Sequence, residues 1–283
     1  MRLSQPAATI TVPDGMPEGP ALARITHLAI GAHQDDCEIM ALHGILECYH
    51  RPGFSFGAVT CTNGSGSPRA GAYAALSDEE MARLRRREQE KAAVVGDYGA
   101  LVQLNHPSAG IKDVRRGDLA ADLAEIFRTC RPRVVYTHNP ADKHETHLAV
   151  GLTAVRALRA LPPERRPESV YGCEVWRNLD WLADREKAAL DVGGHEGLAA
   201  ALIGVYDSQV AGGKRYDLAT LGRLRANATY FDSHKTDRSE ALWFAMDLTP
   251  LVRDDRLDIA DFVLGHIDAF RRDVESKLRR YLP

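Results

Sequence analysis

Apolar and polar residues follow one another along the chain in blocks that predict strands alternating with helices. Short apolar runs, typical of buried strands, occupy residues 26–32, 56–62, 100–104, 133–137 and 170–176. Between them, helical patterns with apolar spacings of three and four cover residues 39–46, 78–95, 117–130 and 145–161. Strands that alternate with helices of this length build parallel sheets. We therefore expect an α/β fold, with a Rossmann-like, mostly parallel sheet and helices on both faces.

The two ends of the chain differ from this pattern. Residues 1–20 are rich in proline and glycine, which predicts a mobile arm or a strap over the body. Residues 21–255 form the expected main domain, and residues 256–283 a C-terminal helical extension. The apolar residues of this extension form one stripe: Ile259, Phe262, Val263, Ile267, Phe270, Val274 and Leu278. We expect the stripe to pack on the body, and the alternative is contact with the helix of an oligomer partner.

Composition and charge exclude several classes of protein. The net charge of -3 gives no support for nucleic-acid binding. No run reaches the ~18 apolar residues that a membrane span needs, and the first residues lack the apolar core of a secretory signal. The five cysteines are scattered without a C-x-x-C pair, which argues against a disulfide framework. We therefore expect a soluble, cytoplasmic protein.

Polar residues that suit metal chemistry follow two of the predicted strands. His33 and Asp36 lie three positions apart after the first strand, with Asp35 between them. His144 and His147 follow the strand at 133–137 and share one face of a helix's first turn. Ligands bind at the carboxyl ends of strands in such sheets, and a hydrolytic zinc needs about three protein ligands with one open position. The two groups together favour a metal site.

Each of these groups taken alone has an ordinary structural explanation. Asp-Asp before a helix usually caps it, and a single histidine at a strand end usually forms hydrogen bonds. The arginines at residues 83–87 are typical of a solvated helix face. Glu174 and Arg177 flank an aromatic residue as a sugar pocket requires, or they are ordinary surface residues. Asn63 and Asp142 are further candidates for contact with a substrate.

The two polar segments resemble those of a known family. Residues 32–39 read AHQDDCEI and residues 136–147 read YTHNPADKHETH. They are similar to the paired motifs of the LmbE-like (PIG-L) de-N-acetylases, and residues 62–64 look like that family's loop after the second strand. The resemblance covers about residues 26–151, with looser similarity at 206–209 and 223–240. It implies a metal-dependent enzyme that removes an acetyl group from a small substrate bearing N-acetylglucosamine.

The resemblance also implies a role for each motif residue. It assigns His33, Asp36 and His147 as the ligands of one Zn²⁺ per chain, a site that Fe²⁺ also suits. It makes Asp35 the general base, and His144 the residue that stabilises the oxyanion. Two departures from the family motifs mean that the resemblance predicts the reaction more closely than it predicts the substrate. Gln34 stands where the family usually has proline, and residues 42–44 replace its usual Gly-Gly-Thr-like turn.

Other functions remain open at this point. An amidase acting on a sugar-thiol or other small amide conjugate would use the same metal chemistry. A metal-binding protein without turnover would hold zinc but release no acetate. A nucleotide-binding domain is disfavoured, because the first strand is not followed by G-x-G-x-x-G and two carboxylates would repel a pyrophosphate.

Overall fold

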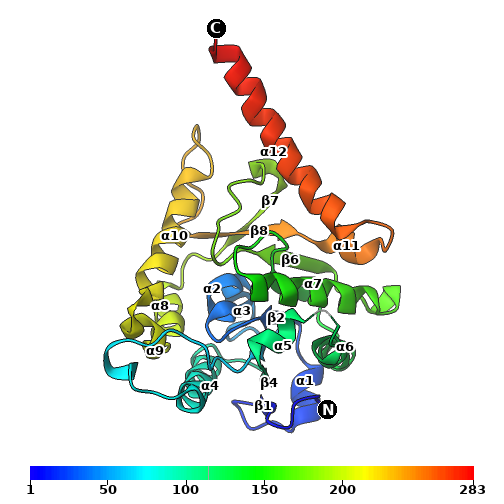
Figure 1. Cartoon of the computed structure of the whole chain (residues 1–283), viewed down its shortest axis with the longest axis vertical. Coiled ribbons are helices and arrows are strands. Elements are labelled where there is room, and N and C mark those ends of the chain that lie inside the picture. Colours follow the sequence, from blue (N-terminus) through cyan, green and yellow to red (C-terminus); the bar gives the residue numbers. More distant parts are fainter. Residues whose placement is uncertain (114) are drawn as a thin grey trace.

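The computed structural model describes residues 1–113 and 115–283, which surround one central sheet (Figure 1). Its strand order is β1-β4-β3-β2-β5-β6-β8-β7. In chain order the strands are β1 (Thr9–Thr11), β2 (His27–Gly31), β3 (Phe56–Thr62), β4 (Ala100–His106), β5 (Val134–His138), β6 (Ser169–Cys173), β7 (Lys187–Asp191) and β8 (Leu242–Asp247). Strands β4, β3, β2, β5 and β6 pair in parallel, as the sequence predicts, and β1, β8 and β7 add antiparallel edges.

The parallel strands are apolar because helices cover both of their faces. Every residue of β2 and β3 is buried, and two separate hydrophobic clusters lie on opposite sides of the sheet. One cluster, which contains Leu28 and Leu123, lies under five helices. These are α1 (Glu18–Ala23), α5 (Ser108–Lys112), α6 (Asp118–Cys130), α7 (Glu145–Arg159) and α11 (Thr249–Arg253). Those on the other side are α2 (Asp36–Met40), α3 (Leu42–Cys48), α4 (Asp78–Val95), α8 (Glu196–Gly204), α9 (Asp207–Gln209) and α10 (Tyr216–Tyr230). The predicted α/β fold is confirmed.

The strand order reverses between β2 and β5, and this position determines where a ligand site forms. From β2 the chain proceeds outward to β3 and β4, then returns to place β5 on the other side of β2. Residues Ile30 and Thr137 are register partners at the carboxyl ends of these two strands. The loops that leave β2 and β5 therefore diverge above one crevice, the usual ligand position in doubly wound sheets.

The N-terminal segment is a strap attached to the sheet. Strand β1 pairs with β4, and Ser4 donates hydrogen bonds from its backbone N–H and its hydroxyl to Asp122, each 2.7 Å long. All five cysteines are buried free thiols, as expected. Across the described ranges, no helix combines the length and the apolar content that crossing a membrane requires.

The C-terminal helix α12 (Ile259–Tyr281) departs from the expected packing. Val263 is its only buried residue, and most of the helix projects beyond the body (Figure 1). Phe262 and Ile259 contact the core, but Phe270, Val274 and Leu278 are exposed. The first part of the stripe therefore packs on the body as expected and the later part does not, and for that part contact with an oligomer partner stays a prediction. Because α12 leaves the surface of the body after its first turns, no residues of the body lie beside its later turns.

Candidate metal centre

The turn between β2 and α2 brings two carboxylates and an imidazole into the crevice. Strand β2 ends at Gly31, where a Cβ atom would lie 2.9 Å from the Cys37 sulfur, so only glycine fits this tight return. Asp35 occupies the left-handed region with φ of 85° and caps α2. Such strain in a non-glycine residue costs of order 1–3 kcal/mol and is concentrated at functional sites. The strained turn directs Asp35 and Asp36 toward the same crevice from adjacent positions.

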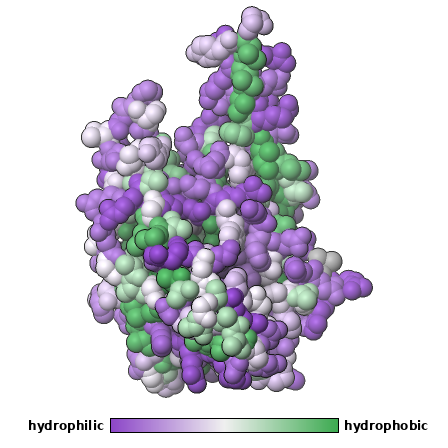
Figure 2. Space-filling view, turned by 60° about the vertical axis from the view of Figure 1, so that its left-hand side comes forward, coloured by the Kyte–Doolittle hydropathy of each residue, from purple (hydrophilic) through white to green (hydrophobic). Residues whose placement is uncertain are grey.

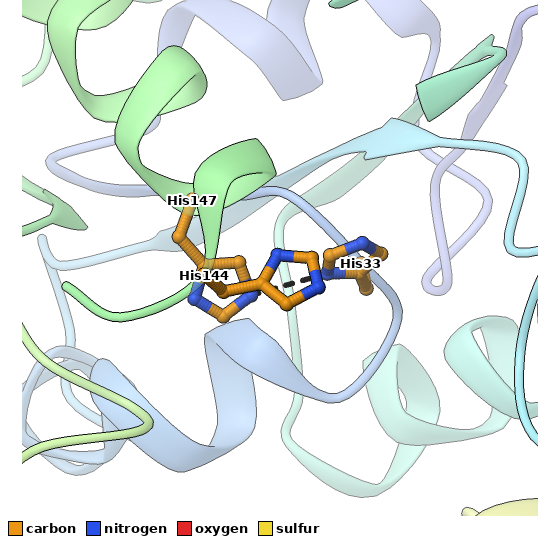
Figure 3. Close-up of side chains that lie close together, drawn as sticks. All are labelled: His33, His144 and His147. Carbon is orange, nitrogen blue, oxygen red and sulfur yellow. Dashed lines mark hydrogen bonds between the residues drawn. The ribbon is translucent and has the colours of Figure 1, made fainter. Parts of the chain in front are cut away.

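Three side-chain atoms from two distant segments form a nearly equilateral triangle. His33 Nδ1 lies 3.2 Å from His147 Nε2 and 3.3 Å from Asp36 Oδ2, and the latter two atoms are 3.4 Å apart. Figure 3 shows His33 and His147 approaching from the β2 loop and from α7. A tetrahedral zinc with ligand bonds near 2.0–2.1 Å has ligand–ligand edges of about 3.3 Å. The spacing and the N/O donor set therefore fit a zinc ion.

A carboxylate behind His147 fixes the orientation of its ring. Asp142 Oδ2 lies 3.0 Å from His147 Nδ1 and also accepts a hydrogen bond from Val175 N. Burial alone lowers the pKa of His147, but Asp36 and Asp142 outweigh it and raise the pKa above its ordinary value. A carboxylate that accepts from the remote nitrogen leaves Nε2 free for a metal, as in many histidine-ligated sites. Asp142 thus lies behind the centre and not on the cavity wall.

His138, which ends β5, is a second histidine close to Asp36. It is fully buried, stacks on His147 at 3.9 Å between ring centroids, and has Nε2 at 3.3 Å from Asp36 Oδ2. Asp36, His138 and His147 thus form a second group with metal-ligand spacing. However, His138 Nε2 accepts a hydrogen bond of 2.9 Å from Ala32 N, which occupies its lone pair. Burial and the neighbouring His147 lower the pKa of His138 to about 4, so it is a neutral support for the turn.

His144 stands at the open side of the centre. It caps α7, and its ring lies edge-on to His33 with 5.0 Å between centroids (Figure 3). Together His33, His144 and His147 make another group with metal-ligand spacing. Unlike His147, His144 is partly exposed, and its Nδ1 has no hydrogen-bond partner among the described residues. Burial, followed by the neighbouring His147 and His33, lowers the pKa of His144. This position suits contact with a bound molecule.

Asp35 is a buried carboxylate held by a buried arginine. Arg85 Nη2 donates to Asp35 Oδ2 over 3.1 Å and also to the carbonyl oxygen of Gln34. Burial raises the pKa of Asp35 to about 7, although Arg85 opposes the shift. A carboxylate with this pKa can accept and return a proton near neutral pH. Asp35 belongs to neither group with metal-ligand spacing, so it need not be a ligand.

A hydrogen-bonded network beneath the centre fixes these carboxylates. Glu88 accepts from the backbone and hydroxyl of Ser208, each over 2.7 Å, and lies 3.6 Å from Arg85 Nη1. Glu38 accepts from Tyr98 and Tyr206 hydroxyls, each over 2.6 Å. Buried polar groups are stable only when they are paired, and Glu38 and Glu88 are. The network links α2 to α4 through Gln89 and Glu38, and both helices to α9 and its N-cap Tyr206.

The centre opens into a cavity of about 510 Å³. Asp35, Asp36, His33, His144 and His147 lie on its floor, and the walls come from loops and from helices α2, α4, α5, α7, α9 and α10. The wall residues are Ile39, Gly64, Gly66, Ser67, Pro68, Arg85, Ser108, Lys112, Thr146, Val175, Trp176, Gln209, Lys214 and Tyr216. A cavity of this size accepts a small molecule.

Comparisons with known proteins agree with this architecture. Residues 28–158 match the family described as PIG-L: GlcNAc-PI de-N-acetylase. The curated "Uncharacterized deacetylase YaiS" of Escherichia coli (strain K12) is 30% identical over 139 residues, which are 48% of this chain and 69% of that protein. The chain belongs to the PIG-L family. This membership makes it an enzyme of the deacetylase class.

Solved structures share the fold of this PIG-L family member. N,N'-diacetylchitobiose deacetylase from Pyrococcus horikoshii superposes with a TM-score of 0.59 at 19% identity, over 77% of this chain and 83% of that one. GalB, the 4-carboxy-2-hydroxymuconate hydratase from Pseudomonas putida KT2440, gives 0.57 at 17% identity, over 79% and 95%. Since a deacetylase and a hydratase share the fold, the fold alone does not determine the reaction.

The candidate substrate residues of this PIG-L chain lie outside the cavity lining. Asn63 accepts from Ser65 N in its own turn. Glu174 is buried and accepts from Leu179 N and the Trp181 indole, and Arg177 is exposed on the surface. Their own loops occupy the side-chain oxygen of Asn63 and both carboxylate oxygens of Glu174, and neither these three residues nor Asp142 line the cavity.

Sequence reasoning missed other residues that do line the PIG-L site. Arg85, expected on a solvated helix face, is 2% exposed, whereas Arg83 and Arg87 are exposed as expected. The RxxE spacing of Arg85 and Glu88 on one helix face was the available signal. Val175 and Trp176, between Glu174 and Arg177, are the residues of that segment that reach the cavity.

Proposed function

We propose that this protein is a zinc-dependent hydrolase that removes an acetyl group from the amide nitrogen of a small N-acetylated substrate, with N-acetylglucosamine conjugates as the first class. One observation carries the proposal: three donor atoms at tetrahedral spacing share a cavity floor with a buried carboxylate and a partly exposed histidine. Family membership and the relative called a deacetylase support the choice of acetyl-amide hydrolysis.

His33 Nδ1, Asp36 Oδ2 and His147 Nε2 are the proposed ligands of one zinc ion, and Fe²⁺ suits the same donors. When bound, zinc supplies a Lewis acid that polarises the amide carbonyl and lowers the pKa of water. Asp142 keeps His147 in the tautomer that presents Nε2. Asp36 Oδ2 also accepts from His33 N over 2.7 Å, which orients its carboxylate toward the triangle.

Asp35 is the proposed general base. Its carboxylate accepts a proton from the attacking water and passes it to the departing nitrogen, so the products are acetate and a free amine. Arg85 positions this carboxylate through Oδ2 and leaves the proton to the other oxygen. Like-charge repulsion from Asp36 contributes to the raised pKa of Asp35, after burial as the largest cause. The two neighbouring carboxylates thereby acquire different protonation behaviour.

His144 is the proposed oxyanion partner. Its Nδ1 is buried without a partner among the described residues, and its ring faces the cavity beside His33. With a proton on the ring nitrogen that faces the cavity, it donates to the carbonyl oxygen as negative charge develops there. Removing one such donor typically costs about 10²–10³-fold in rate.

The cavity wall offers groups that suit a sugar. Trp176 provides an aromatic face, with Lys214 over its ring at 5.2 Å. Arg85 lines the same cavity, and its buried Nε and Nη1 atoms have no hydrogen-bond partner among the described residues. Apolar ring faces combined with a few convergent donors are the usual composition of small-ligand sites.

The test is metal analysis of the purified protein, followed by an acetate-release screen over N-acetylglucosamine conjugates and matched N-acylated thiol conjugates. We expect about one zinc per chain and acetate release that stops on chelation and returns with zinc. Zinc without acetate release from any conjugate would indicate a metal-binding protein without turnover. Turnover of the thiol conjugates alone would replace the proposal with an amidase.

A further inference from the structure

The exposed part of α12 carries an apolar band that nothing in the chain covers among the described residues. Phe270, Val274, Leu278 and Tyr281 are 40%, 38%, 53% and 80% exposed, at spacings of four, four and three. In Figure 2 a green band runs along the projecting helix between purple margins. A helix of 23 residues is about 34 Å long, so the band is extended. Contiguous exposed apolar surface of this kind marks an interaction site.

The band continues into an apolar groove at the base of the helix. Leu148 and Leu152 of α7 supply its apolar part with Ile259, Val263 and Leu264 of α12, and its volume is about 630 Å³. Charged side chains line it as well: Arg156, Arg159, Asp255, Arg256 and Asp258. The groove and the band therefore form one surface, which begins on the body and ends near the tip of α12.

Charge along α12 is divided between its two halves. Residues 258–268 contain three aspartates and neither lysine nor arginine, a net charge of -3. Residues 269–281 contain five basic and two acidic side chains, a net charge of +3. With the N-cap Asp258 counted, the two segments carry equal and opposite charge, and Phe270 is the central residue of the helix.

From this pattern we propose that a second copy of the chain covers the band, as a two-fold dimer in which two α12 helices pair antiparallel. In that arrangement the acidic half of each helix lies along the basic half of the other. Phe270 meets its own copy at the axis, and Leu278 and Tyr281 reach the groove at the base of the partner's helix. The contact is isologous, so it closes at two copies.

The charge division also distinguishes this occupant from others. Parallel pairing would align like-charged halves, which is unfavourable. An anionic membrane would attract the basic half but repel the three aspartates at the base. Only antiparallel pairing with a second copy places both the acidic half and the basic half of α12 beside opposite charge. This inference is independent of the catalytic proposal, because α12 contributes no residue to the cavity at the metal centre.

Sedimentation equilibrium of the full chain tests the proposal. We expect the wild type to have twice the 31.1 kDa mass of one chain, and the Val274→Asp variant to have the mass of a single chain. Ser276→Asp, on the opposite face of the same turn, is the matched control and keeps the dimer. A wild-type chain that is monomeric at high concentration, or a Val274→Asp mass equal to that of the wild type, would overturn the proposal. Monomeric protein that sediments with anionic vesicles would replace the second copy with a membrane.

Disulfide trapping tests the orientation of the helices. The native cysteines are all buried and do not compete. Under oxidation, Phe270→Cys should form a covalent dimer, because this residue lies on the axis. Leu278→Cys should remain a monomer on a denaturing gel, because its copy lies at the far end of the pair. Efficient trapping of Leu278→Cys would indicate parallel helices and contradict the charge argument.

Discussion

The metal centre and the C-terminal helix depart from the usual distribution of side chains in opposite directions. At the centre, Asp35, Asp36 and His147 are almost fully buried. On α12, Phe270 and Leu278 are apolar and exposed. Buried charge is costly unless it is paired or binds a metal, and exposed apolar surface is costly unless something covers it. Our two proposals address these two departures: a cation binds at the first region, and a second copy of the chain covers the second.

His147→Ala should have the largest effect on the centre. It removes one donor of the triangle, and deacetylation should fall to background with loss of zinc from the dialysed protein. Metal content by mass spectrometry and acetate release measure the two effects. His234→Ala, an exposed histidine outside the cavity, is the control and should behave as wild type. Full zinc content in His147→Ala would contradict the ligand assignment.

Asp35→Asn should separate chemistry from metal binding. The amide keeps the shape but cannot accept a proton, so we expect a rate loss of about 10²–10⁴-fold with zinc retained. Single-turnover rates and zinc content of the same preparation check this. If zinc were lost with the activity, Asp35 would be a ligand and not the base.

Asp142→Asn should weaken the centre without abolishing it. The substitution removes the charge behind His147 and keeps an acceptor near its Nδ1 atom, so we expect zinc affinity to fall about 10–100-fold. Titration with a competing chelator measures the affinity. Asp180→Asn, an exposed carboxylate from the same region, is the control. Unchanged affinity in Asp142→Asn would show that the 3.0 Å contact does not support the metal.

The pH dependence of zinc binding should reflect His147. Although burial lowers it, the pKa of His147 is raised by Asp36 and Asp142, and a proton competes with the metal for the ring. Zinc affinity should therefore begin to decrease as pH falls through a value above ~6.5, by up to about tenfold per pH unit. Chelator titrations at several pH values locate this onset. In Asp142→Asn the onset should move to lower pH, and an unmoved onset would assign it to another group.

Val274→Asp should have the smallest effect on catalysis. It lies on the projecting part of α12, far along the chain from every cavity residue, so zinc content and deacetylation rate per chain should match wild type within about twofold. A large loss of rate with intact folding would mean that the two regions are coupled through the dimer.

The sequence predicted the parts of the molecule that depend on local pattern. Apolar runs predicted the buried strands β2, β3 and β5. The rule that ligands bind at the carboxyl ends of strands predicted that the two polar segments come together. Strand β7 was missed, because its residues KAALD at a sheet edge lack a clear alternation of apolar and polar residues. The helix expected at 39–46 is interrupted near Ala41, which separates α2 from α3.

Contacts between distant segments were the least predictable part of the site. Arg85 lies in a run of arginines that is typical of solvent, and its burial depends on Asp35, fifty positions earlier in the chain. Asp142 was expected to face a substrate, but a hydrogen bond to His147 holds it behind the ring. Trp176 could not be distinguished from its neighbours, because which side chain of a loop faces inward depends on tertiary packing.

The short strand β1 has a consequence for how copies of the chain meet. A long open strand at the border of a sheet offers unpaired backbone groups on which another chain can form a new strand, and this leads to aggregation. Here β4 is paired along that border by only three residues, whose segment Ser4 ties down to Asp122. An edge strand of three residues is a poor template for the addition of another strand. Self-recognition through side chains of a helix therefore has little competition from open-ended growth at this border.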